Sequence, residues 1–284
     1  MTNGWNDIAN ADVILAMGGN PAENHPVGFR WVVEAKRNRN AKLVAVDPRF
    51  QRTAAVADCF VQIRVGTDIA FLGGLIHYAL SRGRYHTDYV RQYTNATFLI
   101  REGYGFDEAE GVFSGWDEKA RHYDKSTWNY ELDEKGFARV DPAMAHPRSV
   151  FQLMKHHYSR YTPEMVSRIC GCSPEDFNRA AEIITSTYEP GKAGTIMYAL
   201  GWTHHSFSVQ LIHAGAMLQL LLGNIGVAGG GMNALRGHAN IRAARTAAWP
   251  TTTCPAISPC PGQKTRRSNS SSRRSHPNPC GRTR

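Results

Sequence analysis

Short apolar runs alternate with amphipathic stretches over the first 80 residues of the chain. Residues 13–17 are five consecutive apolar side chains followed by two glycines, which is typical of a buried parallel strand. Similar patterns predict further elements at 27–37 (helix), 43–46 (strand), 53–58 (short helix), 60–65 (strand) and 69–80 (helix). Asp68 directly precedes the last helix and is expected to cap it. This order predicts an α/β fold with a doubly wound, mostly parallel sheet.

The pattern weakens beyond residue 84 and then returns. Residues 84–160 are rich in Tyr, Asp, Glu, Lys and Gly, and they predict an irregular surface excursion without a core of its own. Helical periodicity resumes near 150–159, and Thr162 and Ser173 each precede a Pro-Glu pair, which is a typical helix start. Residues 194–200 predict a buried strand, 208–222 a buried helix and 229–238 an irregular, glycine-rich segment.

The formal net charge of +9 is concentrated near the C-terminus. Residues 242–284 hold nine Lys or Arg and no Asp or Glu, which leaves 24 basic and 24 acidic residues in the first 241. Because no basic face is evident there, the sequence argues against nucleic-acid binding. The tail lacks the apolar pattern that would offset its ordering entropy. We therefore expect one domain at 1–241 and a disordered tail at 242–284.

The apolar runs and the cysteine spacing argue against a membrane span, a signal peptide and a cysteine-bound metal site. There is no run of about 18 apolar residues, so no membrane span is predicted. The first residues lack the basic and apolar regions of a signal peptide, so the chain as written is expected in the cytoplasm. None of the six cysteines has C-x-x-C spacing, and Cys170 and Cys172 are interpreted as structural. We assign no metal ligands.

Four polar segments, three of them glycine-bearing, follow predicted strands or lie at their ends. They are Gly18-Gly19-Asn20-Pro21, Asp47-Pro48-Arg49, Gly66-Thr67-Asp68 and Gly201-Trp202-Thr203-His204-His205. Ligands of open α/β sheets bind at the edge where parallel strands end. Glycine lets a phosphate approach the backbone, and Asp47 or Asp68 can accept hydrogen bonds from a ribose or a base. This arrangement indicates a nucleotide or dinucleotide site; the alternative is ordinary turn glycine.

Several other residues leave two interpretations open. The first turn matches neither G-x-G-x-x-G nor a P-loop, which argues against a standard NAD or ATP site. His25 either lies near a phosphate or stabilises its turn, and His204 and His205 have no suitably spaced partner for a metal. Arg236 follows Gly229–Gly231, and its guanidinium suits a small carboxylate, a cofactor phosphate or a neighbouring acid.

Five longer motifs together resemble one known family. They are residues 17–31 (MGGNPAENHPVGFRW), 46–54 (VDPRFQRTA), 64–70 (RVGTDIA), 198–205 (YALGWTHH) and 222–238 (LGNIGVAGGGMNALRGH). In this order they resemble the catalytic alpha subunit of respiratory, membrane-associated formate dehydrogenases, which are molybdopterin oxidoreductases. The resemblance extends from Met1 to about Ile241.

The resemblance implies a set of cofactor-binding residues and one catalytic residue. Arg236 would orient formate beside the metal. One guanine dinucleotide would be lined by Gly18, Gly19, Asn20, His25, Asp47, Arg49, Thr53, Gly66, Thr67 and Asp68, and the site would continue towards the pterin at Gly201, Trp202, Thr203, Gly223 and Asn224.

The resemblance also implies a reaction and partners. The cofactor would be bis-molybdopterin guanine dinucleotide with molybdenum or tungsten. Formate would be oxidised to carbon dioxide, and two electrons would pass through iron–sulfur clusters to an iron–sulfur beta subunit and a membrane cytochrome gamma subunit. The complete enzyme would be periplasmic and membrane-associated. The alternatives are another molybdopterin oxidoreductase, such as a nitrate or thiosulfate reductase, and a non-catalytic nucleotide-binding or pseudogene product.

Two departures from the family indicate an incomplete subunit that is inactive alone. The cysteines that bind the family's 4Fe-4S cluster are absent, as is the selenocysteine or cysteine that binds the metal. We therefore interpret Met1 as internal, after an in-frame selenocysteine codon. A one-base shift of the reading frame after Ile241 restores family-like residues, so we also expect a frameshift in the tail.

Overall fold

The computed structural model describes residues 1–235. The predicted disordered tail at 242–284 and the predicted catalytic Arg236 lie outside the described residues.

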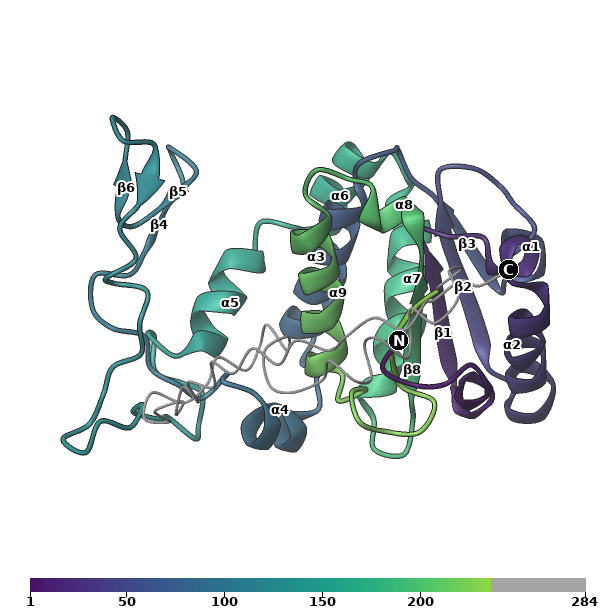
Figure 1. The fold of residues 1–284 in the computed structure, drawn as a ribbon, viewed down its shortest axis with the longest axis horizontal. Helices are drawn as coiled ribbons and strands as arrows, with labels where there is room; N and C mark the ends of the chain where they lie inside the picture. The colour runs from purple at the N-terminus through teal and green to yellow at the C-terminus, as the bar shows by residue number, and fades with distance from the viewer. Residues whose placement is uncertain (236–284) are drawn as a thin grey trace, which may run out of the picture.

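A five-stranded parallel sheet forms the centre of the fold, in the order β3-β2-β1-β8-β9 (Figure 1). Its strands are β1 (Val13–Met17), β2 (Lys42–Asp47), β3 (Cys59–Gln62), β8 (Gly194–Tyr198) and β9 (Gly231–Ala234). The chain moves outward from β1 to β3 and then returns to place β8 on the other side of β1. The strand order therefore reverses between β1 and β8, which confirms the doubly wound α/β prediction.

Helices cover both faces of the sheet (Figure 1). Strand β1 alternates its side chains between the two faces. Leu15 and Met17 join the larger core, whereas Ile14 and Ala16 join the smaller one. The smaller core is covered by η1 (Asn6–Asn10) and α2 (Pro26–Arg39), and the larger by α3 (Asp68–Ser81), α7 (Pro174–Thr185) and α9 (Ser208–Leu221).

Two of the three predicted capping residues cap their helices. The Thr162 hydroxyl accepts from the Met165 N–H at 3.3 Å, and the Ser173 hydroxyl accepts from the Asp176 N–H at 3.0 Å. The prediction that Asp68 caps α3 is wrong, because Thr67 occupies the cap position and Asp68 is the first helical residue. The remaining helices are α1 (Pro21–Asn24), η2 (Ala54–Val56), α4 (Thr87–Tyr93), α5 (Val150–Tyr158), α6 (Pro163–Cys170), η3 (Ser186–Tyr188) and α8 (Leu200–Thr203).

Two elements differ from the prediction near the C-terminal end of the described chain. Strand β8 ends at Tyr198, two residues early, because the chain turns there into the short helix α8. Strand β9 lies within the segment predicted to be irregular. Its sequence, Gly-Met-Asn-Ala, has no apolar run, and it is a strand because its backbone pairs with β8 from Thr195–Gly231 to Tyr198–Ala234.

The excursion at 84–160 contains more regular structure than its sequence indicates. Two short hairpins, β4 (Phe106–Asp107) with β5 (Val112–Phe113) and β6 (Trp116–Asp117) with β7 (His122–Tyr123), project away from the sheet (Figure 1). Aromatic rings hold each hairpin, at centroid distances of 4.8 Å for Phe106–Phe113 and 4.9 Å for Trp116–Tyr123. Strands of two residues are too short to give a periodic pattern of apolar side chains. The sequence pattern therefore does not predict these hairpins.

Within residues 1–235, every helix is too short or too polar to span a lipid bilayer.

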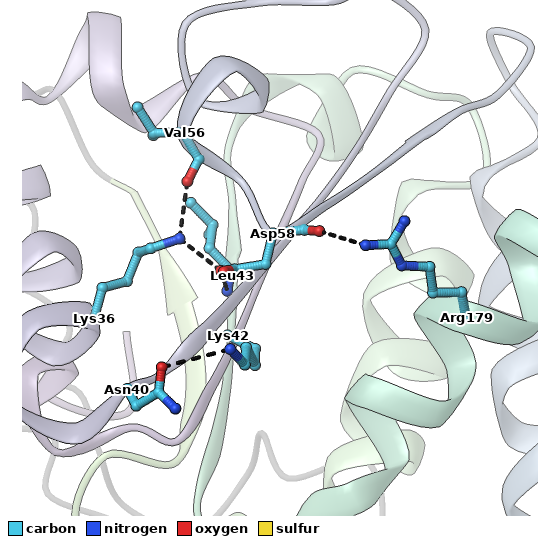
Figure 2. Close-up of polar contacts among 7 residues, drawn as sticks. All are labelled: Lys36, Asn40, Lys42, Leu43, Val56, Asp58 and Arg179. Atoms are coloured by element: carbon cyan, nitrogen blue, oxygen red, sulfur yellow. Dashed lines mark hydrogen bonds and ion pairs between the residues drawn. The ribbon is translucent and has the colours of Figure 1, made fainter.

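Asp58 fixes the start of β3 against β2 (Figure 2). Its backbone N–H donates to the Leu43 carbonyl, and its carboxylate accepts from the Leu43 N–H, both at 2.8 Å. Lys36 of α2 pairs with the same carboxylate at 2.6 Å, and Arg179 of α7 donates to the Asp58 carbonyl at 3.1 Å. Partial burial opposes ionisation of Asp58, but the Lys36 ammonium and the Leu43 N–H outweigh it and lower the pKa. One residue thus joins the sheet to helices on both faces.

We predict that Asp58→Asn lowers the free energy of unfolding by about 1–2 kcal/mol, because a partly exposed charged hydrogen bond is lost. A lowered folded-state pKa contributes stability above the unfolded-state value of about 3.9 and loses it as the pH falls through the folded pKa. The difference from the wild-type chain should therefore be full at pH 7 and shrink below about pH 4. Urea unfolding at several pH values measures it, with the exposed Glu134→Gln as control. A difference that is constant with pH would contradict the ion-pair account.

Candidate functional site

A pocket of about 440 Å³ lies at the carboxyl ends of the parallel strands. It is open at the point where the strand order reverses between β1 and β8, which is where α/β sheets bind their ligands. All four segments predicted from the sequence contribute to it. The lining residues are Gly18, Gly19, Asn20, Asp47, Pro48, Val65, Gly66, Asp68, Leu200, Gly201, His204 and His205.

The turns after β1 and β8 are joined through the Gly18 carbonyl. This oxygen accepts hydrogen bonds from the Ala199 N–H at 3.1 Å and from the Gly201 N–H at 3.0 Å. A Cβ at Gly201 would lie 2.7 Å from the Gly18 oxygen, and a Cβ at Gly19 would lie 3.0 Å from the Ala199 Cβ. The glycines at this turn are thus required by the contact of the two turns, in addition to any approach of a ligand.

The Trp202 side chain packs against Gly18 at this contact. It is fully buried and stacks on Tyr198, with ring centroids 4.9 Å apart. Gly18 has a φ of +74°, and a Cβ there would lie 2.3 Å from the Trp202 Cδ1. The structure therefore places Trp202 beneath the pocket wall, whereas the resemblance implied that it faces the cofactor.

Asp68 is the most buried acid of the pocket. Its side chain is at the first turn of α3, and the residue is only 5% exposed. Burial raises the pKa of its carboxyl and the Asp47 carboxylate adds to this, while His205 lowers the pKa. The His205 Nε2 is 3.7 Å from the Asp68 Oδ2, and the imidazole stacks on Phe207. A buried carboxylate beside one histidine is an acceptor that suits N–H or O–H groups of a ligand.

Asn20 and Thr53 connect the turn after β1 with the loop after β2. The Asn20 side-chain oxygen accepts from the Thr53 hydroxyl at 2.9 Å, and that hydroxyl accepts from the Ala22 N–H at 3.1 Å. Thr53 is fully buried and does not line the pocket. It therefore holds Asn20 in place. Asp47 is held by a turn of its own, in which its carboxylate accepts from the Arg49 N–H at 2.9 Å.

Four further predicted residues lie outside the lining of this pocket. His25 lines a separate pocket beside Trp5, Val27 and Trp31. Its Nδ1 is buried and has no hydrogen-bond partner among residues 1–235. Arg49 and Thr203 are exposed outside the pocket lining, and the Thr67 hydroxyl donates to the Arg64 carbonyl.

Gly223 and Asn224 are not brought to the pocket. The Asn224 side chain accepts from the Gly194 N–H at 3.0 Å and donates to the Thr187 hydroxyl and to Gln219. Gly194 begins β8, so Asn224 lies at the amino end of that strand, opposite the end where the pocket opens. Its polar groups are satisfied within the protein, and its role here is to fix the start of β8.

An apolar rim around the pocket was not predicted from the sequence. Val65 is 77% exposed and Leu200 is 62% exposed, and both line it with Pro48. Val65 and Leu200 each directly precede a predicted segment. An apolar residue next to a binding turn is therefore the sequence signal that could have found them. Such residues can contact the flat face of a base or a neighbouring part of a larger protein.

No group of three His, Cys, Asp or Glu side chains within residues 1–235 is arranged to hold a metal ion. Cys170 and Cys172 are both buried free thiols, and burial raises the pKa of Cys170 to about 11. Thiols held in the neutral form are poor nucleophiles and poor ligands.

Comparison with known proteins gives consistent matches. The family model for molybdopterin oxidoreductases matches residues 1–276. The nitrate-inducible formate dehydrogenase major subunit of Escherichia coli is 51% identical over 93% of this chain and 26% of its own length. The formate dehydrogenase-O major subunit of the same organism is 54% identical, and the formate dehydrogenase subunit alpha of Megalodesulfovibrio gigas 52%, each over 85% of this chain and 24% of their own lengths.

The chain thus spans about a quarter of the length of these relatives. The family match extends to residue 276, whereas the matches to formate dehydrogenase-O and to the Megalodesulfovibrio gigas subunit each cover 242 residues. Among solved structures, the acetylene hydratase of Pelobacter acetylenicus is similar with a TM-score of 0.48 and 18% identity, over 79% of this chain and 24% of that chain.

We predict that Gly18→Ala lowers the free energy of unfolding by about 2–5 kcal/mol, because a positive φ and a clash with a buried indole act together. Gly66 provides the matched control. Its φ is +83°, but no atom of the described part of the chain lies within 4 Å of an added Cβ. Gly66→Ala should therefore cost only about 1–2 kcal/mol. Urea unfolding of both variants measures the difference. Equal costs would show that the two turns do not pack as described.

Proposed function

The chain belongs to the molybdopterin oxidoreductase family, and we propose that it is part of the catalytic subunit of a formate dehydrogenase. The identity of 51–54% to three formate dehydrogenase subunits supports this. The complete subunit would oxidise formate to carbon dioxide, a proton and two electrons. Because the chain spans about a quarter of those relatives, the reaction is a property of the longer protein, and the chain alone would be inactive.

The pocket would hold the nucleotide end of a molybdopterin guanine dinucleotide. The observation that carries this proposal is the convergence of four loops on one pocket at the switch point of the sheet. A volume of about 440 Å³ lies in the range of small-molecule and cofactor sites. When bound, the cofactor and its molybdenum or tungsten supply the redox chemistry.

The residues of the pocket fit a guanine nucleotide in charge and shape. Asp47 and Asp68 offer carboxylate oxygens to the N–H groups of a guanine edge or to ribose hydroxyls. Adenine presents fewer N–H groups on its corresponding edge and would be bound less well. Val65 and Leu200 offer apolar contact for the face of the base and exclude water from these hydrogen bonds. No Lys or Arg of the described chain lines this pocket, so phosphates would rely on backbone N–H groups.

Arg236 would orient formate through two parallel hydrogen bonds. Its own position lies outside the described residues. The preceding Leu235 donates its N–H to the Tyr198 carbonyl at 2.8 Å, at the carboxyl end of β8. The described residues therefore end with Leu235 at the edge of the sheet at which the pocket opens.

Further parts of the proposal concern the longer protein. They are a second guanine dinucleotide, a 4Fe-4S cluster with ligands outside this chain, an iron–sulfur beta subunit and a membrane cytochrome gamma subunit, and a periplasmic, membrane-associated location.

We predict that the chain binds GDP more tightly than ADP, and that Asp68→Asn weakens GDP binding about 10–100-fold, because a charged hydrogen bond is worth about 1.5–3 kcal/mol. Isothermal titration calorimetry with both nucleotides measures this. The exposed Glu182→Gln on α7 is the control and should bind like the wild-type chain. Equal affinity for GDP and ADP, or no binding of either, would contradict the guanine site.

A further inference from the structure

Asp68 is a nearly buried acid in a pocket that offers it little positive charge. The residue is 5% exposed, and the nearby Asp47 carboxylate makes its ionisation less favourable still. No Lys or Arg within residues 1–235 lines the pocket. A buried charge is costly unless it is paired. Guanine is a neutral base and would not supply the missing positive charge, so the protein has to provide it.

The two arginines that neighbour the pocket in sequence are directed elsewhere. Arg49 is exposed outside the pocket lining. The Arg64 guanidinium donates to two backbone carbonyls in the last turn of α6, at 2.9 and 3.2 Å. Among the described residues that do line the pocket, His204 and His205 are the side chains that can become cationic at physiological pH.

His205 is the histidine that lies against Asp68. Its Nε2 is 3.7 Å from the Asp68 Oδ2, and the two side chains are only 21% and 7% exposed. The imidazole stacks on Phe207, with ring centroids 5.1 Å apart and the ring planes inclined by 13°. This stack restrains the plane of the imidazole while Nε2 faces the carboxylate. His204, in contrast, is exposed, so solvent and salt screen any charge that it carries.

The pairing leaves the other acceptor positions of Asp68 for a ligand. A carboxylate has two oxygens and about four acceptor positions, and His205 approaches one oxygen. An adjacent cation favours the ionised form of a carboxyl group. That form matters for recognition, because a protonated carboxyl presents an O–H where the base needs an acceptor.

We propose that His205 is a positioning residue: its imidazolium, restrained by the stack on Phe207, pairs with Asp68 and keeps this carboxylate ionised for recognition of the base. Nucleotide affinity is therefore linked to the charge on a histidine that need not touch the nucleotide itself. This inference rests on the proposed nucleotide site.

Three replacements of His205 separate its charge from its hydrogen-bond donor and its packing. His205→Phe keeps only an aromatic ring on Phe207, His205→Gln keeps a neutral donor, and His205→Lys keeps a positive charge. At neutral pH we expect the Phe and Gln variants to bind GDP about 5–10-fold more weakly, the upper end for an ion pair that is not fully buried. The Lys variant should stay within about 2-fold of the wild-type chain.

A double-mutant cycle and a matched control complete the affinity measurements. In an Asp68→Asn background, His205→Phe should change the affinity for GDP less than about 2-fold, because the charge that it pairs with is gone. His156→Phe removes an exposed histidine of α5, outside the pocket lining, and should bind GDP like the wild-type chain. Calorimetry or ligand-observed NMR measures all of these affinities.

The pH profile of GDP binding gives a readout that packing alone would not move. Binding needs ionised Asp68, so it is lost as the pH falls through the pKa of this carboxyl. The histidine lowers that pKa, and His205→Phe should move the midpoint of the loss to higher pH. As the pH rises above neutrality, the wild-type chain should bind more weakly than His205→Lys, because histidine loses its proton and lysine does not. Asp47, His204 and the GDP phosphates are common to all the proteins, so the differences report residue 205.

Three results would overturn the inference. They are full rescue by glutamine as well as by lysine, equal weakening by His205→Phe in the two Asp68 backgrounds, and an unshifted midpoint. The glutamine and lysine variants test the charge even if the phenylalanine variant does not fold. Failure of the wild-type chain to bind GDP would instead overturn the proposed function, and the inference with it.

Discussion

The Gly18 carbonyl accepts hydrogen bonds from Ala199 and Gly201, and the rest of the site depends on this contact. Strands β1 and β8 are far apart in the sequence and adjacent in the sheet. The turns that follow these two strands must come within hydrogen-bond distance of each other to form the base of the pocket, where the strand order reverses. A side chain on Gly18 or Gly201 would prevent this, because Trp202 and the Gly18 backbone occupy the space. The chemistry of the pocket is therefore built on a close backbone contact.

The polar character of the pocket follows from what surrounds this contact. Asp47 is the last residue of β2, Asp68 is the first residue of α3, and His204 and His205 come from the segment after α8. The described lining is acidic and histidine-containing and lacks Lys and Arg, which favours the base and ribose of a nucleotide over its phosphates. Val65 and Leu200 leave exposed apolar surface at the rim. Such surface is suited to contact with a ligand or with another protein segment.

The sheet and its binding edge could be predicted because buried parallel strands leave continuous apolar runs that end in glycine, as at residues 13–17. The positions of single side chains could not. Trp202 and Thr53, proposed from the resemblance as cofactor-binding residues, are fully buried. Asn224, proposed with them, accepts from the Gly194 N–H at the start of β8. Local sequence shows that a polar residue follows a turn, whereas only the packing shows which way its side chain points. Strand β9 was missed for a related reason, since its pairing partner is 36 residues away.

Hydrogen–deuterium exchange of the chain with and without a guanine nucleotide tests the central claim most directly. The account predicts that GDP protects the backbone around residues 18–20, 47–49, 65–68 and 200–205 together, because all four loops line one pocket. The hairpins at 106–123 and the start of β8 near Gly194 should exchange as before. Protection confined to a single loop, or centred on the pocket beside His25, would contradict the claim that these loops form one nucleotide site.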